Sequence, residues 1–192
     1  MGVTFDSEKK CFVFDFGHDG QNDIVSLTGS GYQIEAFGKC LYYGYEFAAD
    51  VPSAVRTDFI QYVKFPESIR NDSNLTQFIQ KAVNDLNSKI NLYDYDLVIM
   101  PESSSRVNQY MLRYIYRFAQ PTLRPMHVLA NADEQLRQII RTQNVLVIDD
   151  ITTSGSTLNE VLRTLRILND SNNITIFSLI GRKDLMADSI PN

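Results

Sequence analysis

The chain has 192 residues, of which 44% are hydrophobic, and it carries a formal net charge of -5 with a sequence pI near 5.0. This length and composition are enough for one domain, or one domain with an elaboration, around a real hydrophobic core. Because the basic residues are scattered and outnumbered by acidic ones, the sequence has no visible footprint for a phosphate backbone, and we expect no nucleic-acid partner.

The start of the chain does not resemble a targeting segment. Its first residues, MGVTFDSEKK, lack a long apolar run behind a basic patch, and no later stretch is apolar for long enough to span a bilayer. We therefore expect a cytoplasmic protein that does not enter a membrane.

The first part of the chain is strand-like. Aromatic and β-branched runs are broken by Gly and Asp in KCFVFDF, DIVSLTG, YQIEAFG and CLYYGYEFAAD, a pattern typical of hairpins or a small antiparallel sheet. Cys11 and Cys40 lie in these runs without Cys-x-x-Cys spacing or a neighbouring histidine cluster, so we interpret them as free thiols. The pattern changes near Ser68–Ser73, and we assign residues 1–70 to this β-rich segment.

Helical and strand patterns alternate over residues 71–192. Apolar residues at helical spacing predict helices over NLTQFIQKAVNDLNSKI, VNQYMLRYIYRF and TLNEVLRTLRILN, the first with Ser73 or Asn74 as its cap. Short apolar runs predict strands over DLVIMP, RPMHVLA, NVLVIDD and NITIFSLIG. The alternation predicts an α/β core with a mostly parallel sheet flanked by helices on both faces, preceded by the β-rich extension. Ligands of such sheets bind beyond the carboxyl ends of the strands.

The stretch VLVIDDITTSGST, residues 145–157, places acidic and then hydroxyl side chains at one strand end. Asp149 and Asp150 end a buried strand, and we expect them to face a crevice. In the following turn Gly155 lets the backbone bend close to a ligand, while Thr and Ser hydroxyls lie beside the unpaired N–H groups of the next helix. Such a turn can hold a phosphate monoester, and two carboxylates beside it suit sugar hydroxyls or a hydrated Mg2+ ion. Ribose phosphate satisfies both halves, whereas ordinary helix capping explains one hydroxyl but not the row.

This stretch resembles the signature of the type I phosphoribosyltransferases, in which a hydrophobic strand, an acidic pair and a Thr/Ser-Gly-x-Thr/Ser loop bind phosphoribosyl pyrophosphate (PRPP). The order of elements from about Asp94 to Asp184 is similar to that family's core, which implies a type I phosphoribosyltransferase-like, Rossmann-like fold. The resemblance also implies that Asp149 and Asp150 hold the ribose 2- and 3-hydroxyls and Mg2+. The implied PRPP-binding turn consists of Thr152, Thr153, Ser154, Gly155, Ser156 and Thr157.

The same family binds pyrophosphate with a loop after an earlier strand, and here DLVIMPESSSRVNQY stands in that place. By the resemblance, Ser103, Ser104 and Ser105 donate hydrogen bonds and Arg106 neutralises pyrophosphate charge. Glu102 is unfavourable beside an anion, the family's usual glycine is missing, and Ser-rich turns before helices are also common in other proteins.

Family members commonly close a mobile loop that carries Lys or Arg over the pyrophosphate. The matching region, AQPTLRPMHVLANADEQLRQIIRTQ, contains no lysine, so Arg124, Arg137 or Arg141 would have to serve, with His127 as a further candidate. We assign Arg124 the catalytic role together with the acid pair.

The acceptor is left open by the sequence. Members acting on 6-oxopurines generally hold an Asp where this chain has Thr153, which argues against the hypoxanthine and guanine branch and leaves orotate-like, adenine-like, amidotransferase-type and competence-protein-like members. A hood that selects the base would come from the β-rich segment, where Tyr42, Tyr43, Tyr45 and Phe47 either stack on a planar ring or pack into the core.

These features together predict a transferase of the glycosyltransferase class, acting in nucleotide metabolism. The expected partners are PRPP, as co-substrate with Mg2+, and a nitrogenous base or amine that displaces pyrophosphate; homodimers are frequent in the family. The alternative is a catalytically reduced regulatory module that binds PRPP or a nucleotide, which the lysine-free loop region and the glycine-free pyrophosphate loop favour. A nucleoside-phosphate hydrolase on the same scaffold is a third hypothesis.

Overall fold

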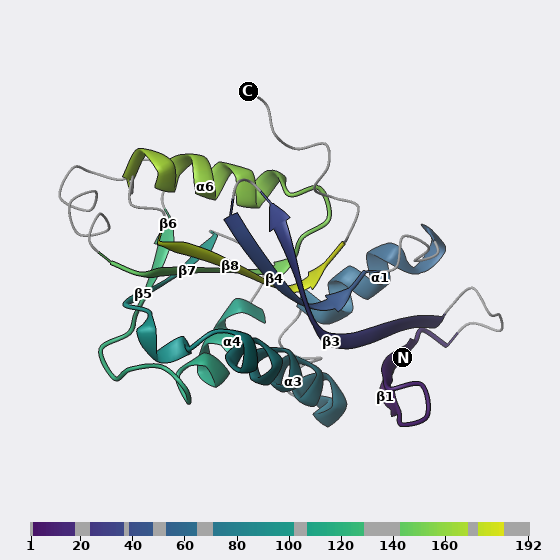
Figure 1. Cartoon of the computed structure of the whole chain (residues 1–192). Coiled ribbons are helices and arrows are strands. Elements are labelled where there is room, and N and C mark those ends of the chain that lie inside the picture. The colour runs from purple at the N-terminus through teal and green to yellow at the C-terminus, as the bar shows by residue number, and fades with distance from the viewer. Residues whose placement is uncertain are drawn as a thin grey trace.

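A mixed sheet forms the centre of the molecule. The computed structural model describes residues 2–17, 24–36, 39–47, 53–64, 71–101, 107–128, 143–168 and 173–182. Eight strands follow the order β1-β2-β3-β4-β8-β7-β5-β6 (Figure 1). The antiparallel part consists of β1 (Gly2–Asp6), β2 (Cys11–Asp15), β3 (Ile24–Ala36) and β4 (Lys39–Glu46). The parallel part consists of β5 (Leu97–Pro101), β6 (Arg124–Val128), β7 (Val145–Ile151) and β8 (Ile174–Gly181), and β4 joins it by pairing parallel to β8.

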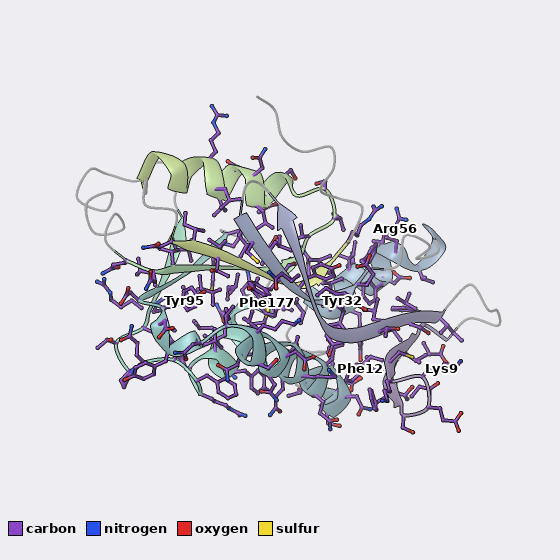
Figure 2. The ribbon with its side chains drawn as sticks, viewed as in Figure 1. Lys9, Phe12, Tyr32, Arg56, Tyr95 and Phe177 are labelled. Atoms are coloured by element: carbon purple, nitrogen blue, oxygen red, sulfur yellow. The ribbon has the colours of Figure 1, made fainter. Side chains whose placement is uncertain are left out.

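Helices cover both faces of the parallel strands. On one face lie α3 (Ser73–Lys89) and α4 (Val107–Ile115), and on the other lies α6 (Ser156–Leu168), as Figure 1 shows. Strand residues alternate between the two cores, so that Leu146 and Ile148 of β7 join the α3–α4 side while Val145 and Val147 join the α6 side. Figure 2 shows side chains filling the layer between the sheet and α3, with Phe177 of β8 among them. The expected α/β architecture with an N-terminal β-rich extension is confirmed.

Two details of the first segment differ from the sequence-based expectation. The two runs expected over DIVSLTG and YQIEAFG are joined in one strand, β3, which spans Ile24–Ala36 with an irregularity in its pairing between Gly29 and Tyr32. A helix that the strand-like interpretation missed, α1 (Ser53–Lys64), follows β4. Its residues Val55, Phe59 and Val63 recur at helical spacing and are at most 1% exposed. None of the helices in the described ranges is both long and apolar enough to cross a membrane.

Asp72, directly before α3, accepts hydrogen bonds from residues of α3, α1 and β1. Its Oδ1 accepts hydrogen bonds from the N–H groups of Asn74 (2.9 Å) and Leu75 (3.1 Å), so Asp72, and not Ser73 or Asn74, is the cap. Its Oδ2 accepts from the hydroxyl of Tyr62 in α1 (2.6 Å) and the N–H of Val3 in β1 (3.2 Å). Burial alone would raise the pKa of Asp72, but the hydrogen bonds from Tyr62 and from three backbone N–H groups together lower it.

Replacing Asp72 by Ala is expected to destabilise the protein by roughly 2–4 kcal/mol, because the helix cap and two contacts to other elements are lost together. Since the folded pKa of Asp72 is lowered, its contribution is complete above the unfolded pKa and is lost as the pH falls through the folded value. Urea unfolding at neutral and acidic pH measures both effects. Asp72→Asn keeps an acceptor for the cap and should lose less; equal losses in the two variants would contradict the capping role.

Candidate functional site

The stretch 145–157 forms a strand, a turn and a helix start at the carboxyl edge of the parallel strands. β7 lies between β5 and β8, with Asp149 paired in register with Ser178 and Ile151 with Ile180. The chain then leaves the sheet, and α6 begins at Ser156. The acid pair and the hydroxyl turn therefore lie at the edge where ligands of such sheets bind.

The turn presents its hydroxyls to solvent at the start of a helix. Ser154, Ser156 and Thr157 are exposed, and the hydroxyl oxygens of Ser154 and Ser156 are 3.0 Å apart. Gly155 adopts a φ of 71°, in the left-handed region that residues with a Cβ avoid, and its carbonyl accepts the N–H of Asn159 as α6 begins. Helix-start N–H groups, a positive helix-dipole end and adjacent hydroxyls together suit an anion.

Thr152 has a different position from its neighbours in the turn. It is 2% exposed, and its hydroxyl donates to the Ser178 Oγ at 2.8 Å and lies 3.4 Å from the Asp149 Oδ2. Its backbone N–H donates to the carbonyl of Ile180, which also accepts the Ser178 hydroxyl. Thr152 thus links β7 to β8 and contacts Asp149. Its hydroxyl is buried and does not join the exposed hydroxyls of the turn.

The two acids are buried, whereas the sequence led us to expect them in an open crevice. Asp149 is 5% and Asp150 2% exposed. The Asp149 Oδ1 accepts the N–H of Asp150 at 3.0 Å, and the Asp150 Oδ1 accepts the N–H of Ile151 at 2.6 Å. Burial, and next the neighbouring Asp150 carboxylate, raise the pKa of Asp149 to about 7, so that it exchanges a proton near neutral pH.

Lys64, the last residue of α1, reaches the acid pair from the N-terminal segment. Its Nζ lies 3.3 Å from the Asp150 Oδ2, and its side chain is 33% exposed. Sequence reasoning missed this residue because α1 itself was missed and because no local pattern links a helix end to a distant strand. The helical spacing of Val55, Phe59 and Val63 was the available signal for α1.

Arg124 lies at the amino ends of the parallel strands, opposite to the carboxyl ends where the acid pair lies. It starts β6 in register with Leu97, which in turn pairs with Val145 at the start of β7. Its guanidinium donates to the Gln143 Oε1 at 3.1 Å and lines a surface pocket of about 550 Å³ that contains none of the acid pair or the turn. The structure does not bring Arg124 to Asp149 and Asp150, and this position does not support the catalytic role expected for it.

Other expected residues are either outside the described ranges or in the core. The residues proposed for the pyrophosphate loop lie outside the described part of the chain; they are Ser103, Ser104, Ser105 and Arg106. Arg137 and Arg141 also lie outside it. Of the aromatic residues considered for a hood, Tyr43, Tyr45 and Phe47 are between 1% and 3% exposed and belong to the core. Tyr42 is partly buried against that core.

The acid pair offers a cation two carboxylates. Among the described residues no group of three or more His, Cys, Asp or Glu side chains is placed to hold a metal. The Asp150 Oδ2 is buried and receives no hydrogen bond from the described residues, and the Lys64 Nζ lies 3.3 Å from it. Mg2+ is commonly held by one or two carboxylates together with waters and ligand phosphates, and the pair fits that mode of binding.

Comparisons with known proteins give one family model and several similar solved structures. Residues 97–184, from β5 to just beyond β8, match the family model described as phosphoribosyl transferase domain. Similar solved structures include a hypoxanthine-guanine-xanthine phosphoribosyltransferase, 16% identical over 60% of this chain and 68% of that chain, with a TM-score of 0.43. A purine phosphoribosyltransferase from Pyrococcus horikoshii Ot3 is 17% identical over 60% and 79% of the two chains, with a TM-score of 0.40. A hypothetical protein from Neisseria gonorrhoeae with bound ppGpp is 17% identical over 66% and 74%, with a TM-score of 0.43. Among curated proteins none matches the chain.

Proposed function

Residues 97–184 belong to the phosphoribosyl transferase domain family, and on that premise we propose that the protein binds PRPP at the carboxyl end of β7 and transfers its phosphoribosyl group to a nitrogenous base or amine. The observation that carries the proposal is the exposed hydroxyl turn that starts α6 directly after two carboxylates. Few arrangements suit a sugar diol and its phosphate at the same time.

The turn binds the 5-phosphate in this proposal. Ser154, Ser156 and Thr157 donate hydroxyl hydrogen bonds, and Gly155 lets the backbone N–H groups approach the phosphate oxygens. The N-terminal end of α6 adds a favourable electrostatic field for the anion.

The acid pair binds the ribose 2- and 3-hydroxyls. Both carboxylates can accept hydrogen bonds from the diol, and Asp149, with its pKa near 7, also donates one when it carries a proton. Because both acids are buried, ligand binding has to open their surroundings, including the contact of Asp150 with Lys64. Mg2+, held by Asp149 and Asp150 jointly with PRPP, would neutralise charge on the pyrophosphate.

The reaction itself needs positioning more than a reactive side chain. The bond from the ribose C1 to a pyrophosphate oxygen breaks, and a bond from C1 to the acceptor nitrogen forms, with loss of a proton from that nitrogen. Fixing the ribose at both its diol and its 5-phosphate holds C1 in place while the two groups exchange. Electrostatic stabilisation of the positive charge that develops at C1 is the remaining requirement, and the adjacent carboxylates suit it.

A regulatory module that binds PRPP or a nucleotide without turnover is the second candidate. The burial of the acid pair and its contact with Lys64 favour this regulatory module. The position of Arg124 at the amino ends of the parallel strands, away from the acid pair, favours it as well. Both candidates use the same ligand site and differ only in turnover.

A binding and turnover experiment separates the candidates. PRPP binding is measured by calorimetry in the presence of Mg2+, and pyrophosphate release is followed with a panel of bases and amines. Binding with acceptor-dependent pyrophosphate release is the expected result for a transferase, and binding without release across the panel is the result for a regulatory module. Absence of PRPP binding would refute the transferase, and absence of both PRPP and nucleotide binding would refute both candidates.

The double variant Asp149→Asn with Asp150→Asn is expected to weaken PRPP binding at least about 100-fold, because charge-assisted hydrogen bonds to the diol are lost at both positions. The matched control is Asp85→Asn on α3, whose partner is Lys81 in an ion pair away from the site. Circular dichroism of each variant verifies folding. Unchanged PRPP affinity in the folded double variant would remove the acid pair from the site.

A further inference from the structure

Lys64 approaches the ligand site from outside the phosphoribosyl transferase domain. The helix that carries it is fixed on the core by Val55, Phe59 and Val63, and the ring of Phe59 packs edge-on against Phe14 at a centroid distance of 5.0 Å. Val63, the residue directly before Lys64, is fully buried and fixes the position of the Lys64 backbone. Its side chain is one-third exposed at 33% and has the flexible four-carbon stem of lysine. The helix end is thus anchored while the ammonium remains able to change position.

The ammonium of Lys64 compensates a buried carboxylate oxygen. The Asp150 Oδ2 receives no hydrogen bond from the described residues, and the Lys64 Nζ lies 3.3 Å from it. A buried carboxylate is costly unless a cation or hydrogen-bond donors accompany it, and Asp149 next to it adds a second acidic group. The contact with Lys64 therefore matters most when nothing else is bound to the acid pair.

We propose that Lys64 and a divalent cation are alternative occupants of the acid pair, so that Lys64 neutralises Asp150 in the empty site and has to withdraw before a divalent cation binds. A cation such as Mg2+ binds carboxylate oxygen at about 2.1 Å. On the Asp150 Oδ2 it would lie against the ammonium, and two positive charges repel strongly in a place screened little by water. The inference rests on the proposed function only in placing divalent-cation binding at Asp149 and Asp150.

Through this competition Lys64, which belongs to the N-terminal segment, controls whether a divalent cation occupies the acid pair. Withdrawal of the Lys64 side chain breaks the contact between α1 and β7, and its return restores the contact, while the helix stays in place. Binding of the metal and the position of the Lys64 side chain are then linked, and each changes the equilibrium of the other.

The test uses Mn2+ as the probe, with free Mn2+ measured by electron paramagnetic resonance in the full chain without PRPP. Lys64→Met is expected to bind Mn2+ at least about 10-fold more tightly than the wild type, because the competing charge is gone. Lys64→Arg keeps the charge and is expected to bind as weakly as the wild type. Lys81→Met is the matched control, since Lys81 pairs with Asp85 at 2.6 Å on α3 with a similar exposure of 36%.

Two results would overturn the inference: Mn2+ binding by Lys64→Met that is no tighter than in the wild type, or a gain that persists when Asp150→Asn is added. If Lys64→Met does not fold without metal, Mn2+ has to restore its folding in a thermal-unfolding scan, and failure to do so overturns the inference equally. Because the assay contains no PRPP, a wild-type chain that fails to bind PRPP would refute the proposed function without deciding this result.

Discussion

Asp149→Asn is expected to stabilise the folded protein at about pH 8 by roughly 2–4 kcal/mol and to remove most of the decline in stability between about pH 4 and pH 7. In the native chain, burial and then the Asp150 carboxylate raise the pKa of Asp149 from 3.8 to about 7. A carboxyl with a raised folded pKa binds its proton more tightly in the folded state. Its favourable contribution is therefore complete below the unfolded pKa and is lost as the pH rises through about 7. Asparagine carries no charge at any of these pH values.

The surroundings of Asp149 suit a neutral side chain. The Thr152 hydroxyl, 3.4 Å from the Asp149 Oδ2, has a shorter contact of 2.8 Å to the Ser178 Oγ, to which it donates. The Ser178 hydroxyl in turn donates to the carbonyl of Ile180 at 2.8 Å. Protonated Asp149 can therefore donate to the Thr152 oxygen and complete this chain of hydrogen bonds. The asparagine amide can take the same place, while its oxygen accepts the N–H of Asp150.

Urea unfolding of the wild type and Asp149→Asn at a series of pH values between about 4 and 8 measures the effect. The two stability curves should diverge as the pH rises, with the variant higher at the alkaline end. Asp85→Asn, which changes a partly buried acid paired with Lys81 on α3, is expected to follow the wild type. Curves that stay parallel for Asp149→Asn would show that the side chain holds no extra proton in the folded state.

Local patterns in the sequence predicted the part of the site that is local in the chain. The strand β7, the bend at Gly155 and the start of α6 lie within thirteen consecutive residues, and their order follows from apolar spacing and turn chemistry. The same patterns predicted the alternation of strands and helices around them, because strands buried on both faces consist of continuous apolar runs.

The same local patterns could not predict contacts between segments that are distant in the sequence. The burial of Asp149 and Asp150 and the arrival of Lys64 depend on how α1 packs, which apolar spacing does not specify even when the helix itself is recognised. Arg124 was assigned to catalysis from its place in the chain, but strand register puts it level with Leu97, at the amino end of the parallel strands. Asp72 caps α3 in place of Ser73 because its side chain accepts the N–H groups of Asn74 and Leu75, and only its further contacts with β1 and α1 required the three-dimensional structure.

Residues 71–192 produced without the first 70 are expected not to fold. β4 pairs along β8 from Leu41 with Ile176 to Glu46 with Gly181, so its removal exposes an edge of β8 in the middle of the sheet. An uncovered apolar strand edge of this kind favours aggregation over a stable monomer.

The core also loses the rings that surround Phe78 of α3. Tyr45 stacks on Phe78 at a centroid distance of 3.8 Å and donates its hydroxyl to the Phe78 carbonyl at 2.7 Å. Phe12 and Phe14 pack against the same ring at 5.2 and 5.4 Å. Burial of a large apolar side chain stabilises by about 1.5–3 kcal/mol, so these three residues and Phe59 together contribute roughly 6–12 kcal/mol. That sum is comparable to the whole stability of an ordinary domain, about 5–15 kcal/mol.

Thermal and urea unfolding followed by circular dichroism, together with an amide NMR spectrum, test the truncated chain against the full one. We expect no cooperative transition and poorly dispersed amide signals from residues 71–192 alone, and partial recovery when residues 1–70 are co-expressed as a separate chain. A cooperative transition in the truncated chain would show that the boundary near residue 70 separates two units that fold independently. In that case the Lys64 contact would join two domains, whereas the shared core around Phe78 favours one cooperative unit in which α1 cannot leave the core while the rest stays folded.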